Sequence, residues 1–223
     1  MLRISIKITV LLAACCLSAG CAYNVATTAR PALNVYSSNQ NKIPGKWAII
    51  VRDDSLQGNA KVQGLACSAN HFPLDVRDTF KSSTLLTASN VFQQVEARDA
   101  TPDVSSYGSG GYAGAVIVNV DTMEARLHWN TGFWTSTPEA TMTLIGGVRV
   151  LGPTGEVWSF GANAQRDTDG KAAVAGCGGG ADAAAEAFDK AENDFLSQIA
   201  GRLADSPEVK SLGTATKRIS PAS

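Results

Sequence analysis

The sequence predicts an α+β domain in which a single mixed or antiparallel sheet has two helices packed on one face. Runs rich in β-branched and aromatic residues alternate with turn residues along most of the chain. Segments 74–92 and 181–205 instead repeat apolar residues at helical spacing. Because the strands are largely consecutive in the sequence, they favour one sheet with helices on the outside.

The first half of the domain contains three expected strands and one helix. Segments 46–53 and 60–67 are rich in strand-forming residues and are separated by a polar turn. The helix follows Pro73, and segment 93–99 then resembles a strand. The helical stripe consists of Val76, Phe80, Thr84 or Leu85, Ala88 and Val91.

The second half begins with a Gly/Ser-rich loop over 101–114. In segment 115–129 the residues that would face the two sides of a sheet alternate most regularly, so it is the strongest strand candidate. Segment 139–167 follows as two strands around the turn 152–155, and segment 181–205 is the clearest helix. The apolar stripe of that helix is Ala184, Phe188, Ala191, Phe195, Ile199 and Leu203.

Residues 1–20 have the pattern of a lipoprotein signal peptide. Arg3 and Lys7 precede an apolar run that is too short to span a bilayer. The stretch Leu17-Ser-Ala-Gly-Cys21 resembles a lipobox. Cleavage before Cys21 is therefore expected to make this residue the new N-terminus, where it carries lipid that includes palmitate. A competing box ends at Cys15, and the same pattern is compatible with an ordinary signal peptide or an uncleaved anchoring helix.

A lipidated Cys21 implies a periplasmic protein attached to a membrane by its N-terminal lipid. Position 22 is Ala rather than Asp. By resemblance to sorted lipoproteins, this favours the periplasmic face of the outer membrane over retention in the inner one. No transmembrane helix is expected after residue 21.

Three further boundaries follow from composition. Residues 21–44 are polar and aperiodic and are expected to form a lipidated N-terminus with a flexible tether. Residues 45–204 are the α+β domain. Residues 205–223 lack aromatic side chains and are expected to be a disordered C-terminal tail.

Removal of the signal peptide and lipidation of Cys21 leave Cys67 and Cys177 as the remaining cysteines. Two cysteines in an oxidising periplasm predict one disulfide. The alternative is two separately buried thiols.

The charge balance implies no basic surface for nucleic acid, and no nucleic-acid partner is expected. The chain has 19 basic and 20 acidic residues, and loss of Arg3 and Lys7 with the signal leaves 17 basic residues.

No cofactor or metal site is expected. The glycine-rich loop over 108–114 leads into a strand, whereas a dinucleotide fingerprint leads into a helix. Gly178-Gly-Gly180 lacks a following Lys-Ser or Lys-Thr, and the Asp167–Gly170 turn lacks the later ligands of a calcium loop. His71 and His128 have no clear third metal ligand.

No catalytic site is expected either, since the serines lack a nucleophile elbow and the disulfide accounts for Cys67. The sequence therefore predicts that the protein is not an enzyme.

Aromatic residues around the 130–132 turn form the candidate binding site. Trp129, Phe133 and Trp134 are either core residues or a docking surface for protein, lipid or glycan. Tyr107 and Tyr112, in a Ser/Gly-rich context, are candidates to join that surface.

The lipobox at Cys21, the sequence Gly155-Glu-Val-Trp158-Ser and the Ala-rich closing helix give this chain a layout that resembles small accessory lipoproteins of the Gram-negative envelope. Lipopolysaccharide-assembly, transport-auxiliary and curli-secretion lipoproteins share it. The resemblance implies a non-enzymatic component that binds an envelope protein partner in a biogenesis, secretion or transport machine. A lipid- or glycan-binding lipoprotein and a periplasmic hydrolase remain open as second and third hypotheses.

Overall fold

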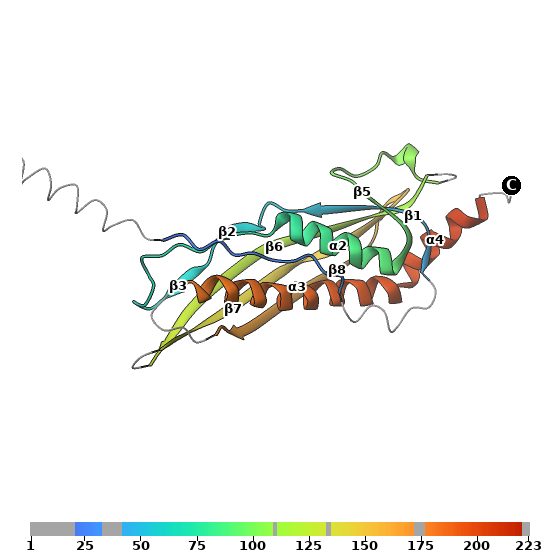
Figure 1. The fold of residues 1–223 in the computed structure, drawn as a ribbon. Helices are drawn as coiled ribbons and strands as arrows, with labels where there is room; N and C mark the ends of the chain where they lie inside the picture. The colour runs from blue at the N-terminus through green and yellow to red at the C-terminus, as the bar shows by residue number, and fades with distance from the viewer. Residues whose placement is uncertain (1–20, 33–41, 109–110, 133–134, 172–176, 220–223) are drawn as a thin grey trace, which may run out of the picture.

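The computed structural model describes residues 21–32, 42–108, 111–132, 135–171 and 177–219. These residues form an elongated body with a mixed sheet on one side and helices on the other (Figure 1). The elements are β1 (Ile43–Arg52), β2 (Gln57–Asn59), β3 (Lys61–Gln63), β4 (Pro73–Asp75), α2 (Arg77–Val91), β5 (Phe92–Ala97), the 3₁₀ turn η2 (Val104–Ser106), β6 (Tyr112–Thr131), β7 (Ser136–Gly152), β8 (Gly155–Asp169), α3 (Gly179–Asp205) and α4 (Pro207–Ile219).

The main sheet has six strands, five of them in the order β5-β1-β6-β7-β8. Strand β1 lies parallel to both β5 and β6, whereas β6, β7 and β8 form an antiparallel meander. Strand β3 pairs in parallel with residues 126–128 of β6, beyond the part of β6 that pairs with β1. The predicted α+β class with a mixed sheet is confirmed.

An irregularity at Asp121 lets the long strand β6 keep one face buried along its whole length. The pairing of β6 with β7 shifts between Val120 and Thr122, so Asp121 is an extra residue. From Val116 to this bulge the even-numbered positions face the core, and after it the odd-numbered positions do. The buried core residues of β6 from Val116 onward are Val116, Val118, Val120, Ala125, Leu127 and Trp129.

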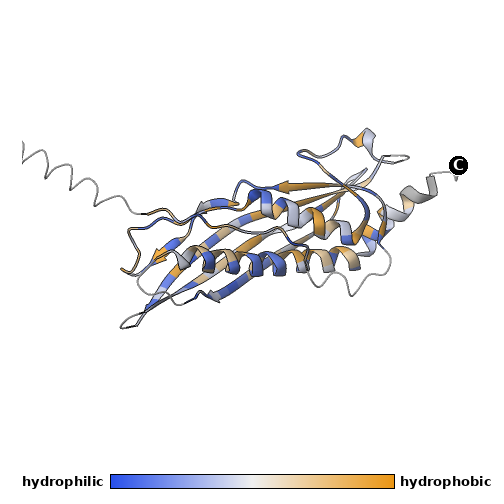
Figure 2. Ribbon diagram, viewed as in Figure 1, coloured by the Kyte–Doolittle hydropathy of each residue, from blue (hydrophilic) through white to orange (hydrophobic). Residues whose placement is uncertain are grey.

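Helices α2 and α3 cover one face of the sheet, where the apolar residues of the strands gather (Figures 1 and 2). Helix α3 places small alanines against the strands, which lets its backbone approach the sheet closely. Its two phenylalanines, Phe188 and Phe195, are fully buried, and Phe195 lies 6.0 Å from Phe80 of α2 between ring centroids. Each such ring contributes roughly 1.5–3 kcal/mol by its removal from water.

The opposite face of the sheet has a much smaller apolar cluster. Ala48, Ile50, Ala115 and Ile117 form it near η2, together with Tyr112. The rest of this face is covered by no described helix (Figure 1). We call it the open face.

Most predicted strands and both predicted helices are confirmed, with shifted ends. The strand expected over 60–67 is reduced to β3, because the chain turns at Gly64 with φ +86°.

The expectation of a disordered tail over 205–223 is wrong for residues 207–219, since Pro207–Ile219 forms helix α4, and residues 220–223 lie outside the described ranges. Ser206 caps this helix by accepting a hydrogen bond from the Val209 N–H at 3.2 Å, and Pro207 occupies the first helical position. Val209 is fully buried and joins the core, with Leu212 packed against it. The Ser-Pro pair that ends α3 therefore also begins the next helix.

We expect Val209→Asp to lower the free energy of unfolding by about 3 kcal/mol or more, because it buries a carboxylate without a partner. The neighbouring exposed change Lys210→Asp is the matched control and should have little effect. Urea denaturation of both variants measures the difference. Equal stabilities would show that α4 does not pack on the domain.

Candidate functional site

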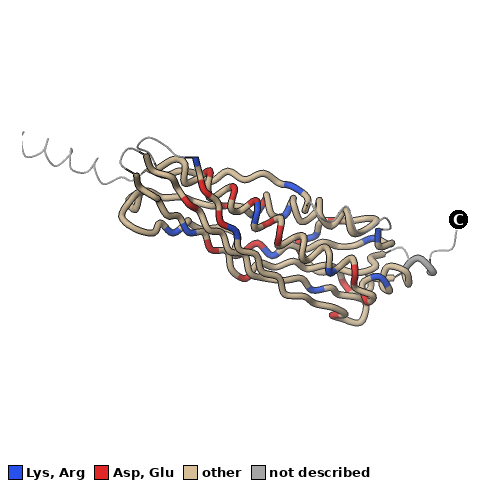
Figure 3. The backbone as a smooth tube through the Cα atoms, turned by 90° about the horizontal axis from the view of Figure 1, so that it is seen from below, with Lys and Arg blue, Asp and Glu red and all other residues tan. Residues whose placement is uncertain are grey.

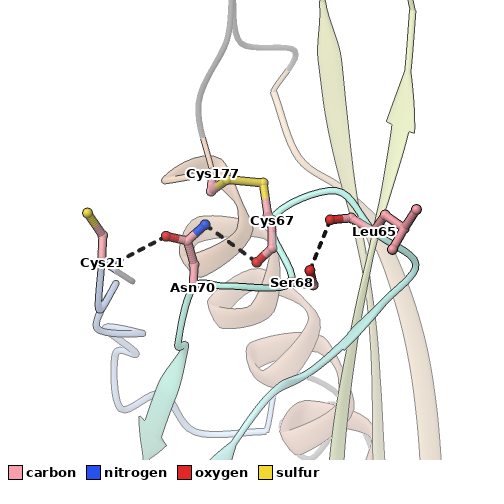
Figure 4. Close-up of a disulfide and its surroundings, with 6 residues drawn as sticks. All are labelled: Cys21, Leu65, Cys67, Ser68, Asn70 and Cys177. Carbon is pink, nitrogen blue, oxygen red and sulfur yellow. Dashed lines mark hydrogen bonds between the residues drawn. A yellow bond between two sulfur atoms is a disulfide. The ribbon is translucent and has the colours of Figure 1, made fainter. Parts of the chain in front are cut away.

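Cys21 is bound to the domain through its backbone. Its N–H donates to Asn70 Oδ1 at 3.2 Å, and its carbonyl oxygen accepts from the His71 N–H at 3.1 Å (Figure 4). Its thiol is free and the residue is exposed. The residue predicted to carry a lipid is therefore attached to the 64–71 loop, at one end of the body (Figure 1).

The predicted disulfide between Cys67 and Cys177 is confirmed, with 5.8 Å between the Cα atoms. It joins the 64–71 loop to the start of α3, beside Cys21 (Figure 4). Cys67 has φ +60° and is the sole non-glycine residue with positive φ in the described ranges. The disulfide and the Asn70 side chain, which donates to the Cys67 carbonyl at 3.4 Å, fix this loop.

Residues 21–32, which we call the strap, run from Cys21 along the cleft between α2 and α3 (Figure 1). The first part pairs with the segment before α2: Tyr23 N–H donates to His71 O at 2.8 Å and Val25 N–H to Pro73 O at 3.2 Å. The second part binds three hydroxyl groups of α2. These bonds join Thr27 Oγ1 to Thr79 Oγ1 (2.9 Å), Arg30 N to Ser83 Oγ (3.0 Å) and Ala32 N to Thr87 Oγ1 (2.9 Å).

The hydroxyl residues of α2 recur every four positions, so they lie on one stripe of the helix. They supply acceptors for strap groups that would otherwise lose hydrogen bonds on burial. The predicted flexible tether over 21–44 is therefore wrong for residues 21–32, and Val25 and Ala32 are buried. The 33–41 part of that prediction lies outside the described residues.

A groove of about 480 Å³ lies between the strap and α3. It is lined by Thr28, Arg30, Pro31, Glu186, Asp189, Lys190, Glu192 and Asn193.

Glu192 is the buried acid of this groove, with 3% of its surface exposed. Burial raises its pKa to about 8; a bond with Ser83 opposes the rise and Asp189 adds to it. Burial also raises the pKa of Asp189, while Arg30 lowers it. Glu192 Oε1 has no hydrogen-bond partner among the described residues.

The sequence contained a signal for Glu192 that the predicted helical stripe left out. Position 192 is four residues after Phe188 and three before Phe195, so it falls within the apolar stripe. A glutamate on a buried stripe marks an acid that folding must desolvate.

The open face has a polar depression along the middle strands. Two adjoining hollows of about 290 and 450 Å³ share Asn119, Asp121 and Arg149. The other exposed or partly exposed polar residues that line them are Arg52, Asp54, Ser55 and Ser159.

Glycines form the floor of this depression. A Cβ at Gly146 would lie 2.1 Å from Asn119 O, and one at Gly147 would lie 2.6 Å from Phe160 O, so neither position accepts a side chain without a shift. Gly161 differs, since the nearest atom to its Cβ position is 3.9 Å away. The backbone at Gly161 is exposed and can be approached closely, whereas Gly147 is buried. A side chain at Gly161 would fill the hollow.

The polar side chains of the depression retain unused hydrogen-bonding capacity. Asn119 Nδ2 donates to Asp121 Oδ1 at 2.7 Å, whereas Arg149 is 3.9 Å from Glu156 in a long, exposed ion pair. An exposed arginine loses little when it exchanges such a pair for a partner's acceptor.

The described residues of the predicted aromatic binding site are not brought together as one group, since Trp129 lies apart from Tyr107 and Tyr112. Trp129 is 3% exposed and packs against Phe72, with 5.5 Å between ring centroids, so it is a core residue and the docking prediction is wrong for it. Phe133 and Trp134 lie outside the described residues. Tyr112 is buried and donates to Glu96 Oε1 at 2.8 Å, and Tyr107 is half-buried against the same small cluster.

Little space separates the helices from the sheet. The hollow there measures about 20 Å³ and is lined mainly by apolar side chains such as Ile49, Val116 and Leu196. This hollow has no room for a lipid chain.

Across the described ranges, no group of three or more His, Cys, Asp or Glu side chains is arranged to hold a metal ion. None of the described helices combines the length and hydropathy needed to span a bilayer.

The sequence matches no family model and no curated protein. Solved structures are similar to it at low identity. A Xanthomonas campestris protein described by family model DUF330 has a TM-score of 0.45 and 12% identity, over 85% of this chain and 96% of that one. A putative neuraminyllactose-binding hemagglutinin homolog from Helicobacter pylori has a TM-score of 0.41 and 10% identity, over 82% of this chain and 95% of that one. A minor lipoprotein from Acinetobacter baumannii has a TM-score of 0.37 and 13% identity, over 74% of this chain and 93% of that one.

Joint replacement of Cys67 and Cys177 by serine should lower the free energy of unfolding by roughly 4–5 kcal/mol, because the bridge closes a long loop in the unfolded chain. Urea denaturation of the purified protein measures the loss. Val104→Ser, at an exposed side chain away from the bridge, is the control and should leave the stability unchanged. An unchanged midpoint for the double variant would contradict the constraint assigned to the bridge.

Glu192→Gln should flatten the pH dependence of stability. The folded pKa of Glu192, about 8, exceeds the ordinary value of 4.5, so the folded state holds the proton more tightly between these values. Wild-type stability should therefore fall by a few kcal/mol as pH rises through this window. Thermal unfolding from pH 5 to 9 measures the slope.

The matched control is Glu186→Gln, on the exposed side of the same helix, which should keep the wild-type slope. Asp189 should leave a smaller slope of the same sign in Glu192→Gln. If Glu192→Gln kept the steep fall of stability with pH seen in the wild type, the pH dependence would belong to another group.

Proposed function

We propose that this chain is a non-enzymatic lipoprotein, anchored through Cys21 to the periplasmic face of the outer membrane, that binds a protein component of an envelope biogenesis, secretion or transport machine. The binding site is the depression on the open face. The observation that carries the proposal is that one face of the sheet is left without a helical cover and has a glycine floor between exposed polar side chains.

The attachment of the strap supports a positioning role. A lipid on Cys21 would be joined to the domain through the bonded strap and not through a free linker. The domain would then hold the depression at a restricted distance from the membrane surface. A restricted position suits a component that meets its partner inside a membrane-bound assembly.

The composition of the depression supports a protein partner. Arg52 and Arg149 offer planar donors, and Asn119 and Ser159 offer both donors and acceptors. Arginine is enriched at protein interfaces, and the glycine floor allows a partner's backbone to come close.

Two observations weigh against a lipid carrier and a hydrolase. The small hollow between sheet and helices does not favour a lipid carrier. Asp189 and Glu192 are the types of residue that a hydrolase uses, but Glu192 is almost fully buried between α3 and α2, where a substrate would not reach it.

The test is site-specific photo-crosslinking in intact cells of the native bacterium from position 159. We expect a discrete protein adduct, identified by mass spectrometry. Adding Gly161→Trp should abolish the adduct by filling the depression. Gly201→Trp, at a glycine on α3 whose Cβ position has nothing within 4 Å, should leave it unchanged.

Separate outcomes test each part of the proposal. Loss of membrane fractionation in Cys21→Ser is expected if this residue carries the lipid, and retention would contradict the anchor. Adducts with lipid or glycan alone, or no adduct, would contradict a protein partner. An adduct that Gly161→Trp leaves intact would move the contact away from the depression.

A further inference from the structure

The end of the molecule that contains Cys21 is free of charged side chains over two adjacent segments. Residues 21–29 of the strap and residues 62–74 contain no Asp, Glu, Lys or Arg. Elsewhere, charged residues of both signs are spread along the helices and strands (Figure 3). The two segments are bonded to each other through His71 and Pro73, so they form one uncharged surface region.

Leu65 projects from this region with 95% of its surface exposed. It is held in a defined turn: the Ser68 hydroxyl donates to the Leu65 carbonyl at 3.0 Å, and the disulfide at Cys67 fixes the next residues. The same loop binds Cys21 through Asn70 (Figure 4), and its outer bend is hydrophobic (Figure 2). A large apolar side chain is thus presented to solvent from a rigid loop.

Tyr23 adds an aromatic side chain beside this loop. Its ring stacks on Phe72 at 5.5 Å between centroids and is only partly buried. Tyrosine is favoured at membrane surfaces, because one part of its ring tolerates the apolar region while the hydroxyl stays hydrated.

We propose that this end of the domain lies against the phospholipid bilayer and that Leu65 inserts into its surface. The inference rests on the proposed lipid anchor at Cys21, and it adds a second point of contact. Charged side chains are costly once a loop penetrates below the lipid headgroups, which accounts for a charge-free region beside the anchor. Since the acyl chains already retain the protein on the membrane, the insertion of Leu65 fixes the orientation of the domain.

The test uses full-length lipidated protein in vesicles of phosphatidylethanolamine and phosphatidylglycerol. Leu65→Trp introduces a fluorophore at the proposed contact, and lipids brominated on their acyl chains quench tryptophan that touches them. Relative to wild type, the added emission should shift to the blue and be largely lost with brominated lipid. Because the Leu65 side chain is exposed, the substitution should not perturb folding.

Val104→Trp is the matched control. Val104 is 72% exposed and lies in η2, towards the opposite end of the body (Figure 1). Its added emission should remain unquenched and unshifted.

Flotation of the same vesicles separates the two proposals. Protein that floats with the vesicles while the Leu65→Trp emission stays unquenched overturns the insertion of Leu65 and leaves the anchor standing. Equal quenching at positions 65 and 104 also overturns it, since the end near Cys21 would have no preferred contact. Protein that does not float overturns the lipid anchor and the inference together.

Discussion

The burial of one sheet face beneath α3 and α2 is the constraint on which the other features depend. Alanines on α3 let this long helix lie close to the strands, and Phe80, Phe188 and Phe195 fill the remaining space. The close contact explains why the hollow between the layers is small. With both helices on one side, the polar side chains of the strands face solvent on the other, which creates the open face.

The same arrangement creates the cleft that the strap occupies. Two helices side by side leave a groove between them, and the hydroxyl stripe of α2 makes that groove a suitable site for an extended chain. The strap fixes Cys21 near the disulfide, so the proposed lipid, the uncharged loop and the start of α3 lie at one end. Membrane attachment and the position of the open face would thereby be coupled through ordinary hydrogen bonds.

The strap and the tail show why some local predictions were wrong. Both segments are polar, and the tail also lacks aromatic side chains, which is typical of linkers. The strap is ordered because α2 supplies partners for its backbone, and those partners are about fifty residues away in the sequence. The tail is ordered because Val209 reaches a core pocket, although its local pattern already contained the Ser-Pro start of a helix.

The sequence by itself determined the features that depend on local periodicity and on cysteine number: the α+β class, the two long helices, the β6 to β8 meander and the disulfide. It also indicated the alternation that separates the two faces of β6, although not the bulge at Asp121 that preserves it. Only the tertiary structure decided that Trp129 is core and that Cys21 is bonded to the domain. These properties depend on which distant segments meet, and side-chain spacing along a single segment carries no information about that pairing.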